Sequence, residues 1–228
     1  MPDSNLSPGL FRFLEDLRAN NNREWFADQK PRYESDVLLP AVELVAALEK
    51  PLAKVAPMLA AVPKKHGGSI MRIYRDTRFS KDKTPYKTNV GISLRHQADS
   101  DIYAPGVYVH LEPKNCFIGA GCWRPNRKTL AQIRAAIDED PRSWCRARDQ
   151  STKKTDFELA GDRLKTSPKG YSIDHPMIED LRRIDFIAVA PLQEQELTSN
   201  LAIERIVARV REVRPLMRFL CSAIGEPY

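Results

Sequence analysis

The sequence has few of the features that mark membrane, secreted or fibrous proteins. Among its 228 residues, no apolar run approaches the roughly 20 residues that a transmembrane helix needs. The chain starts Met-Pro-Asp-Ser-Asn, without the basic start and apolar stretch of a secretory signal, and a collagen-like repeat is also absent. We therefore expect a soluble cytoplasmic protein that does not enter a membrane.

Cysteine and histidine are scarce and scattered, so disulfide and zinc frameworks are not indicated. The four cysteines are Cys116, Cys122, Cys145 and Cys221, and the four histidines are His66, His96, His110 and His175. No C-x-x-C pair or zinc-like spacing occurs. The G-x-S-x-G and phosphate-loop motifs are absent too, which weakens serine hydrolase and NTPase interpretations. We expect no metal and no cofactor.

What the chain does have is ordinary globular composition with a basic excess. Hydrophobic residues make up 42% and charged residues 29%. The 36 Lys and Arg residues outnumber the 30 Asp and Glu residues, which gives a formal net charge of +6 and a pI near 9.2. At this length we expect a single domain over residues 1–228.

Hydrophobic periodicity predicts an α+β fold with a mostly antiparallel central sheet. Apolar residues at helical spacing indicate a helical part over residues 7–60, and period-two alternation indicates a sheet core over residues 69–123. The remainder, 125–224, mixes helices and strands and ends in one long helix that Asn200 can cap. The strands are expected at 70–76, 90–95, 106–112, 116–123, 157–159 and 185–189. This pattern predicts a meander of about four to six strands covered by the N- and C-terminal helices.

Residues 72–87, here called the basic loop, concentrate the positive charge. They hold six basic and two acidic residues, a net +4 that accounts for two thirds of the formal excess of the chain. Their first part reads as a strand, which places Arg72, Tyr74 and Asp76 on one face. The Ser, Asp, Lys and Pro content from Thr77 onward indicates a loop, and loops held by a rigid sheet commonly carry binding residues.

Thirteen residues of this segment, R-D-T-R-F-S-K-D-K-T-P-Y-K at 75–87, resemble the signature of domain-of-unknown-function family 2461, a family of conserved bacterial and fungal proteins. Further matching segments are N-N-R-E-W-F at 21–26, Y-V-H-L-E-P at 108–113, F-I-G-A-G at 117–121, W-R-P at 123–125, P-K-G-Y at 168–171 and D-H-P at 174–176. The resemblance covers about residues 7–220. It implies a shared fold and surface and carries no activity or catalytic residues.

The basic loop is typical of an anion site. Arginine forks bind phosphate or carboxylate through two hydrogen bonds, while neighbouring carboxylates orient them. The expected anion contacts are Arg72, Arg75, Arg78, Lys83 and Lys87, with Asp76 and Asp82 orienting them. A phosphate-bearing ligand is favoured, and nucleic acid is the largest candidate because of the basic pI. The alternative is an ion-pair network that only fixes the loop to the sheet, in a structural or interaction module without a ligand.

A second candidate site lies on the strand expected at 106–112. Tyr108, His110 and Glu112 alternate, so they share one face of that strand. A histidine beside a carboxylate is an acid–base pair in many enzymes, because the carboxylate fixes its tautomer. This supports an alternative in which the protein is an enzyme acting on a small phosphorylated or carboxylated metabolite, with His110 or Asp76 as acid–base. A half-exposed strand with outward polar residues explains the same pattern. The oligomeric state and the strand order stay open.

Overall fold

The computed structural model describes residues 6–98 and 104–228. Its N-terminal helices are α1 (Pro8–Ala19), α2 (Arg23–Asp28), α3 (Lys30–Tyr33), the π-helical turn η1 (Glu34–Leu38) and α4 (Leu39–Ala53). The Ser7 hydroxyl caps α1 by accepting a hydrogen bond from the Gly9 amide, and Pro8 at the first position needs no amide partner. At the start of α2 the Asn22 side chain accepts from the Trp25 amide. The turn between α1 and α2 is therefore closely defined.

The six strands form one antiparallel sheet, as the sequence predicts. They are β1 (Leu59–Ala60), β2 (Val90–His96), β3 (Gly106–Leu111), β4 (Phe117–Cys122), β5 (Glu158–Ala160) and β6 (Phe186–Pro191). Their order across the sheet is β1-β2-β3-β4-β6-β5. The meander holds from β1 to β4, and β6 then pairs with β4 and leaves β5 at the edge.

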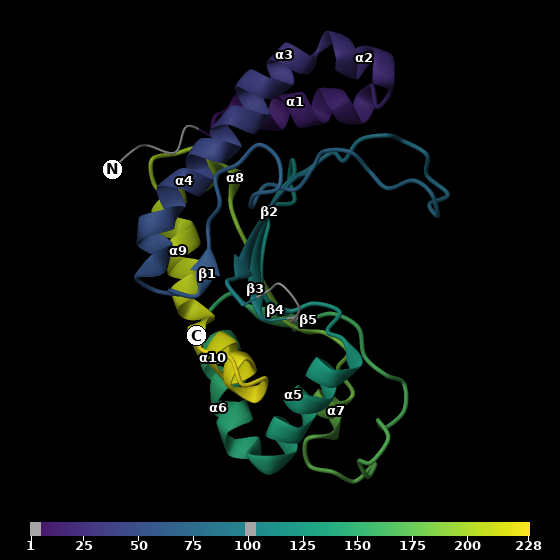
Figure 1. Ribbon diagram of the computed structural model, residues 1–228, viewed down its shortest axis with the longest axis vertical. Coiled ribbons are helices and arrows are strands. Elements are labelled where there is room, and N and C mark those ends of the chain that lie inside the picture. The colour runs from purple at the N-terminus through teal and green to yellow at the C-terminus, as the bar shows by residue number, and fades with distance from the viewer. Residues whose placement is uncertain (1–5, 99–103) are drawn as a thin grey trace.

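The strand expected at 70–76 is wrong. Ile70 makes only an isolated bridge to Ile92, and Tyr74 makes one to Tyr86. The segment instead pairs with the other limb of its own loop, since the Arg75 amide donates to the Pro85 carbonyl and the Lys87 amide to the Ile73 carbonyl. Pro85 has no amide hydrogen to extend a regular ladder. The basic loop is thus an irregular two-limbed ribbon that projects from the upper end of the sheet (Figure 1).

The C-terminal part supplies α5 (Arg127–Glu139), α6 (Pro141–Thr152), α7 (Ile178–Leu181), α8 (Glu194–Leu197), α9 (Ala202–Glu212) and α10 (Arg214–Ala223). The single long final helix expected from Asn200 is in fact two helices that meet at Val213. Pro215, within the first turn of α10, cannot donate the backbone hydrogen bond that a continuous helix requires at that position. Nor does Asn200 cap α9, whose N-cap residue is Leu201.

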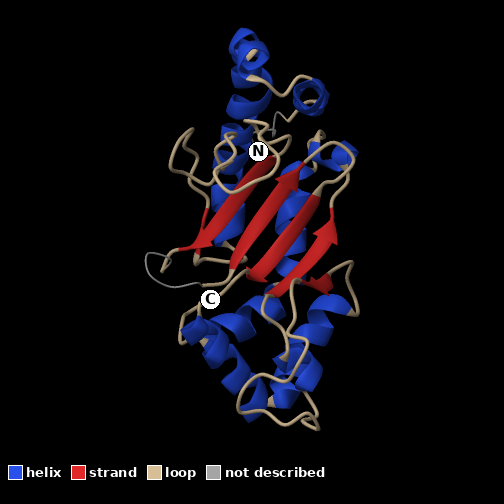
Figure 2. Ribbon diagram, turned by 90° about the vertical axis from the view of Figure 1, so that its right-hand side faces the viewer, coloured by secondary structure: helices blue, strands red, loops and turns tan. Residues whose placement is uncertain are grey.

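The two faces of the sheet differ. Helices α4 and α9 pack on one face (Figure 1), where Val107, Val109 and Leu111 of β3 are buried. Figure 2 looks onto the opposite face, across which no helix of the described residues runs. Tyr108 and His110 lie on that open face, half-buried. The expected helical cover is therefore confirmed for one face, and the basic loop projects on the side of the other (Figure 1).

A membrane-crossing segment was searched for among the same residues. Of the helices in 6–98 and 104–228, none is long and apolar enough to span a bilayer.

Candidate functional site

The basic loop is anchored to the turn between α1 and α2. The Asn21 side chain donates to the Tyr86 carbonyl at 3.0 Å and accepts from the Tyr86 amide at 3.1 Å. The buried Tyr86 ring stacks on Phe26 of α2, with ring centroids 4.1 Å apart. Two elements far apart in the sequence therefore share one wall.

Two carboxylates of the loop hold two of its arginines. The Arg75 guanidinium donates to Asp82 and Thr84, and Asp82 also accepts from the Thr84 amide at 2.9 Å. Asp76 binds Arg78 through two hydrogen bonds of 2.9 and 2.7 Å. Hydrogen bonds from Arg75 and Thr84 lower the pKa of Asp82 to about 2, and those from Arg78 do the same for Asp76. Both carboxylates stay charged at neutral pH and hold their arginines, as both the anion-site and the structural-network interpretations require.

Two lysines connect the two limbs of the ribbon. Lys83 donates to the Thr77 carbonyl at 2.9 Å and Lys87 to the Arg72 carbonyl at 3.0 Å. Burial and the neighbouring Arg72 charge lower the pKa of Lys87. A lysine in such surroundings gains from an anion close by, because the anion replaces lost hydration.

Two adjoining hollows flank the loop. The larger has a volume of about 720 Å³ and the smaller about 360 Å³, and they share Asn21, Arg75, Thr84 and Tyr86 as lining residues. Five cationic side chains line one or both of them. These are Arg18, Arg23, Arg75, Lys83 and Lys87. Among the described lining residues of the two hollows, one, Asp82, is acidic, so positive charge dominates.

The structure places only some of the predicted anion contacts here. Arg75, Lys83, Lys87 and the orienting Asp82 line the hollows. Other predicted residues, Arg72, Arg78 and Asp76, are exposed outside both linings. Sequence reasoning about the loop missed Arg18 at the end of α1, Arg23 at the start of α2 and Asn21 in the turn between them. The only local signal was the matching segment N-N-R-E-W-F at 21–26, whose spatial neighbours the sequence does not reveal.

The predicted pair of His110 and Glu112 adjoins the smaller hollow. His110 Nε2 lies 3.2 Å from Glu112 Oε2, and His110 Nδ1 lies 3.0 Å from Tyr108 Oη. Arg18, which lines the hollow, forms an ion pair of 2.8 Å with Glu112. Burial raises the pKa of Glu112, but hydrogen bonds from Asn115 and His110 and the Arg18 charge outweigh it, so the net shift is downward. Glu112 is therefore a carboxylate that fixes His110. Asp76 is bound to Arg78 instead.

Asn89 connects the smaller hollow to the open face of the sheet. It lines the hollow, and its Nδ2 lies 3.5 Å from both Tyr108 Oη and His110 Nδ1. Gly91, opposite His110 on β2, makes room for this arrangement, since a Cβ there would lie 2.7 Å from Tyr108 Oη. The His110 ring in turn stacks on Phe117 of β4, with centroids 4.5 Å apart and an angle of 12° between the planes. Aromatic rings thus continue from the hollow across β3 and β4.

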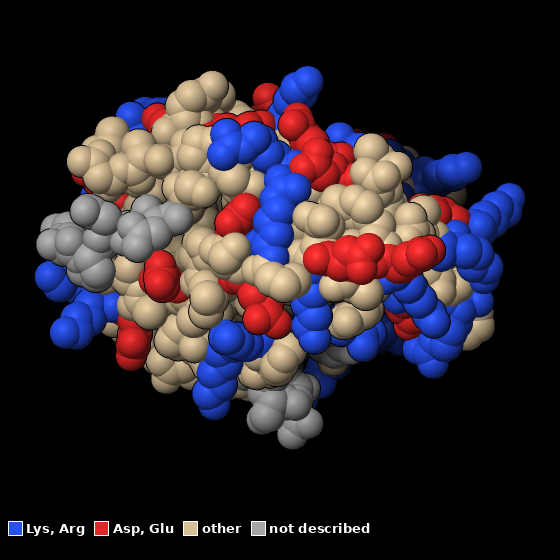
Figure 3. All heavy atoms as spheres, turned by 90° about the horizontal axis from the view of Figure 1, so that it is seen from above, with Lys and Arg blue, Asp and Glu red and all other residues tan. Residues whose placement is uncertain are grey.

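The surface charge agrees with this picture. Seen from above, Lys and Arg side chains gather toward the end where the basic loop projects, with Asp and Glu side chains among them (Figure 3). The loop region is therefore cationic, although several of its charges are paired.

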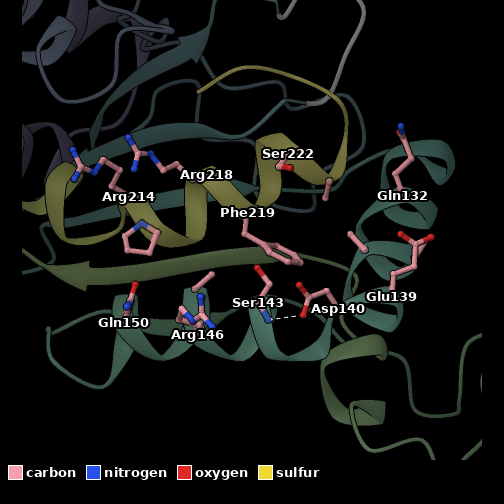
Figure 4. A pocket seen from close by; sticks show the side chains of 15 residues that line it. Gln132, Glu139, Asp140, Ser143, Arg146, Gln150, Arg214, Arg218, Phe219 and Ser222 are labelled. Carbon is pink, nitrogen blue, oxygen red and sulfur yellow. Dashed lines mark hydrogen bonds between the residues drawn. The ribbon is translucent and has the colours of Figure 1, made fainter.

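A still larger hollow, of about 810 Å³, lies at the other end of the molecule between α5, α6 and α10. Phe219 reaches into it, Arg146, Arg214 and Arg218 lie toward one end, and Glu139 and Asp140 toward the other (Figure 4). Asp140 already caps α6 by accepting from the Ser143 amide at 2.9 Å. This helical groove contains none of the predicted site residues.

Metal ligation finds no support in the described ranges 6–98 and 104–228, where no group of three or more His, Cys, Asp or Glu side chains could hold an ion.

Comparison with known proteins gives one match. The model of the family described as conserved hypothetical protein (DUF2461) matches residues 9–219. Neither a curated protein nor a solved structure matches the chain.

Proposed function

The chain belongs to the DUF2461 family of conserved hypothetical proteins, and from this premise we propose that its function is to bind a phosphate-bearing anion in the two hollows beside the basic loop. The observation that carries the proposal is the charge of their walls, where five cationic side chains meet a single carboxylate of the described residues. The family match spans the residues that build both hollows, including the turn between α1 and α2.

The chemistry of the walls suits phosphate. Arg75 is held in place by Asp82 and Thr84, so its fork loses little freedom when it binds an oxyanion. Arg23 and Lys83 line the same hollow, one from α2 and one from the loop. Asn21, Asn22 and Thr77 add neutral hydrogen-bonding groups. Such mixed donors recognise phosphate oxygens without requiring full charge neutralisation.

Nucleic acid is the largest ligand of this chemistry, and the basic pI and net charge of +6 support it. A cytoplasmic location is part of the proposal. The four cysteines are free thiols, which suits a reducing compartment.

Isothermal titration with inorganic tripolyphosphate at low and near-physiological salt tests the proposal. Lys83→Ala removes a lining charge, and Lys81→Ala is the matched control, because Lys81 is an exposed lysine of the same loop outside both linings. We expect Lys83→Ala to weaken binding about tenfold and Lys81→Ala to leave it within a factor of two. Equal effects, or no tripolyphosphate binding at low salt, would contradict the proposal.

An enzymatic function is the second candidate, and the hydrogen-bonded series of Tyr108, His110 and Glu112 at the rim of the smaller hollow favours it. In this alternative His110 acts as the acid–base and Glu112 orients it. Release of inorganic phosphate from a set of sugar and nucleoside phosphates, lost in His110→Gln, would support it. Turnover that survives His110→Gln would exclude His110 from the chemistry.

In a purely structural module, by contrast, Arg75→Ala would lower the melting temperature and leave the binding of every anion unchanged. That result would exclude the anion site beside the loop, and the His110→Gln assay would then decide the enzymatic candidate.

A further inference from the structure

We infer that the anion is a single-stranded nucleic acid, whose phosphates bind in the two hollows and whose bases stack on aromatic rings from Tyr74 to Phe117. This inference rests on the proposed function, since it names the ligand class for the same site. Throughout, the nucleic-acid track denotes the larger hollow, the smaller hollow and the rings of Tyr108, His110 and Phe117 on the open face of the sheet.

The first section of the track combines an exposed ring with cationic side chains. Tyr74 lines the larger hollow and is 55% exposed, an unusual exposure for so large an apolar surface. Its ring is supported from below by Tyr86, with centroids 5.4 Å apart. Arg23, Arg75 and Lys83 line the same hollow. A base can stack on the free ring face while the adjoining phosphates contact these cations.

The second section is continuous with the first. The smaller hollow shares Asn21, Arg75, Thr84 and Tyr86 with the larger one and adds Arg18 and Lys87. The lowered pKa of Lys87 reflects a partly desolvated charge that a neighbouring phosphate would stabilise. Cationic side chains therefore line both of the adjoining hollows, an arrangement that suits a chain of phosphates.

The third section is the open sheet face. Asn89 leads from the smaller hollow to Tyr108 and His110, and the His110 ring is stacked on Phe117. Gly119 lies directly across from Tyr108 and has no side chain to cover the sheet at this point. A Cβ there would meet nothing closer than 3.8 Å, so there is space above the backbone. No helix of the described residues covers it (Figure 2). Half-buried rings on an exposed sheet beside a cationic hollow are complementary to unstacked bases with a charged backbone.

The strand must be single because the bases of a duplex are stacked on one another and cannot reach Tyr74 inside a hollow. A duplex would offer phosphates alone, and it would engage the exposed tip of the loop. Phe79 marks that tip. It is 96% exposed and lines neither hollow.

Fluorescence anisotropy with a labelled oligothymidine of about 12 nucleotides, the matching duplex and thymidine monophosphate tests the inference. Tyr74→Leu and Phe117→Leu remove flat rings and keep apolar volume, and Phe79→Leu is the matched control outside the track. We expect Tyr74→Leu to weaken single-strand binding about tenfold, Phe117→Leu to weaken it about fivefold, and Phe79→Leu to leave it unchanged. Phe117→Leu and Phe79→Leu, whose rings line neither hollow, should bind tripolyphosphate as the wild type does and keep its melting temperature, and Tyr74→Leu should weaken tripolyphosphate binding far less than oligothymidine binding.

Several results would overturn the inference while the anion site stands. Tyr74→Leu could bind oligothymidine as tightly as the wild type, or Phe79→Leu could weaken binding as much as Tyr74→Leu does. The wild type could also bind the duplex, or thymidine monophosphate, as tightly as it binds the single strand. If the wild-type protein did not bind tripolyphosphate at all, that result would instead refute the proposed function itself. The two failures are therefore separable.

Discussion

The hollows beside the basic loop and the groove between α5, α6 and α10 are similar in size but not in chemistry. The groove, at about 810 Å³, exceeds the larger loop hollow at about 720 Å³. Its lining has three arginines and two carboxylates, Glu139 and Asp140, and Phe219 fills part of it (Figure 4). The loop hollows instead gather cations from two distant segments against one described carboxylate. The candidate site is therefore distinguished from the groove by the excess of positive charge among its lining residues, and not by its volume.

The largest expected effect comes from Arg75→Ala, because Arg75 lines both hollows and holds Asp82 and Thr84. The substitution removes a cation and leaves the Asp82 carboxylate unpaired where the anion binds. A hydrogen bond to a charged group contributes about 1.5–3 kcal/mol, and Arg75 offers its fork to the anion, so we expect tripolyphosphate affinity to fall about thirtyfold in calorimetry. Arg75→Lys keeps the charge without the fork, so its tripolyphosphate affinity should lie between those of the wild type and Arg75→Ala. Unchanged affinity in Arg75→Ala would remove the distinction between loop hollows and groove.

A matched pair of arginine substitutions compares the two regions directly. Arg23 lines the larger loop hollow, and Arg218 lines the groove, where its guanidinium lies 5.8 Å from the Tyr228 ring centroid. We expect Arg23→Ala to weaken tripolyphosphate binding about tenfold and Arg218→Ala to leave it within a factor of two. If Arg218→Ala has the larger effect, the groove is the anion site.

Gly91→Ala tests the junction between the smaller hollow and the sheet face. The added Cβ would lie 2.7 Å from Tyr108 Oη, so the Tyr108 ring must move away from Asn89 and His110. We expect a loss of roughly 1–3 kcal/mol in the free energy of unfolding from urea titration. Oligothymidine binding should weaken several-fold, while tripolyphosphate binding stays the same. Equal weakening for both ligands would mean that the rings and the anion hollows are not separate sections.

The smallest effect is a pH dependence of the loop. Asp82 has an ordinary pKa of 3.8 and a folded-state pKa of about 2, through hydrogen bonds from Arg75 and Thr84. Because the folded-state pKa is the lower one, its contribution to stability is complete above about pH 4 and is lost as the pH falls toward 2. NMR signals of Thr84 should therefore hold steady between pH 7 and pH 5 and shift below pH 4. In Asp82→Asn that shift should disappear, and its persistence would assign it to another group.

Local patterns predicted most of the sheet and missed what depends on distant pairing. Val107, Val109 and Leu111 alternate with polar residues because one face of β3 is buried, so the strand is legible in the sequence. The same alternation at 70–76 gave a strand that does not exist, since a ribbon that pairs with its own second limb shows the same period. The apolar stripe that continues past Val213 likewise hid the helix break near Pro215.

For a similar reason, only the part of the candidate site that lies in the basic loop could be predicted from the sequence. Arg75, Asp82, Lys83 and Lys87 stand together in one charged segment, and composition alone singles them out. The other part of the lining includes Arg18, Asn21 and Arg23, and Asn21 lies 65 residues from the Tyr86 that it holds. No local rule relates two such segments, because their contact is set by how the turn between α1 and α2 and the helix α2 pack against the basic loop.

The most direct measurement of the central claim is a crystal structure of the protein soaked in tungstate, a tetrahedral oxyanion whose anomalous scattering locates it without bias. The account predicts an anomalous peak inside the loop hollows, within contact distance of Arg75 and of Arg23, Lys83 or Lys87. Peaks confined to the groove between α5, α6 and α10, or to surface lysines such as Lys81, would contradict it.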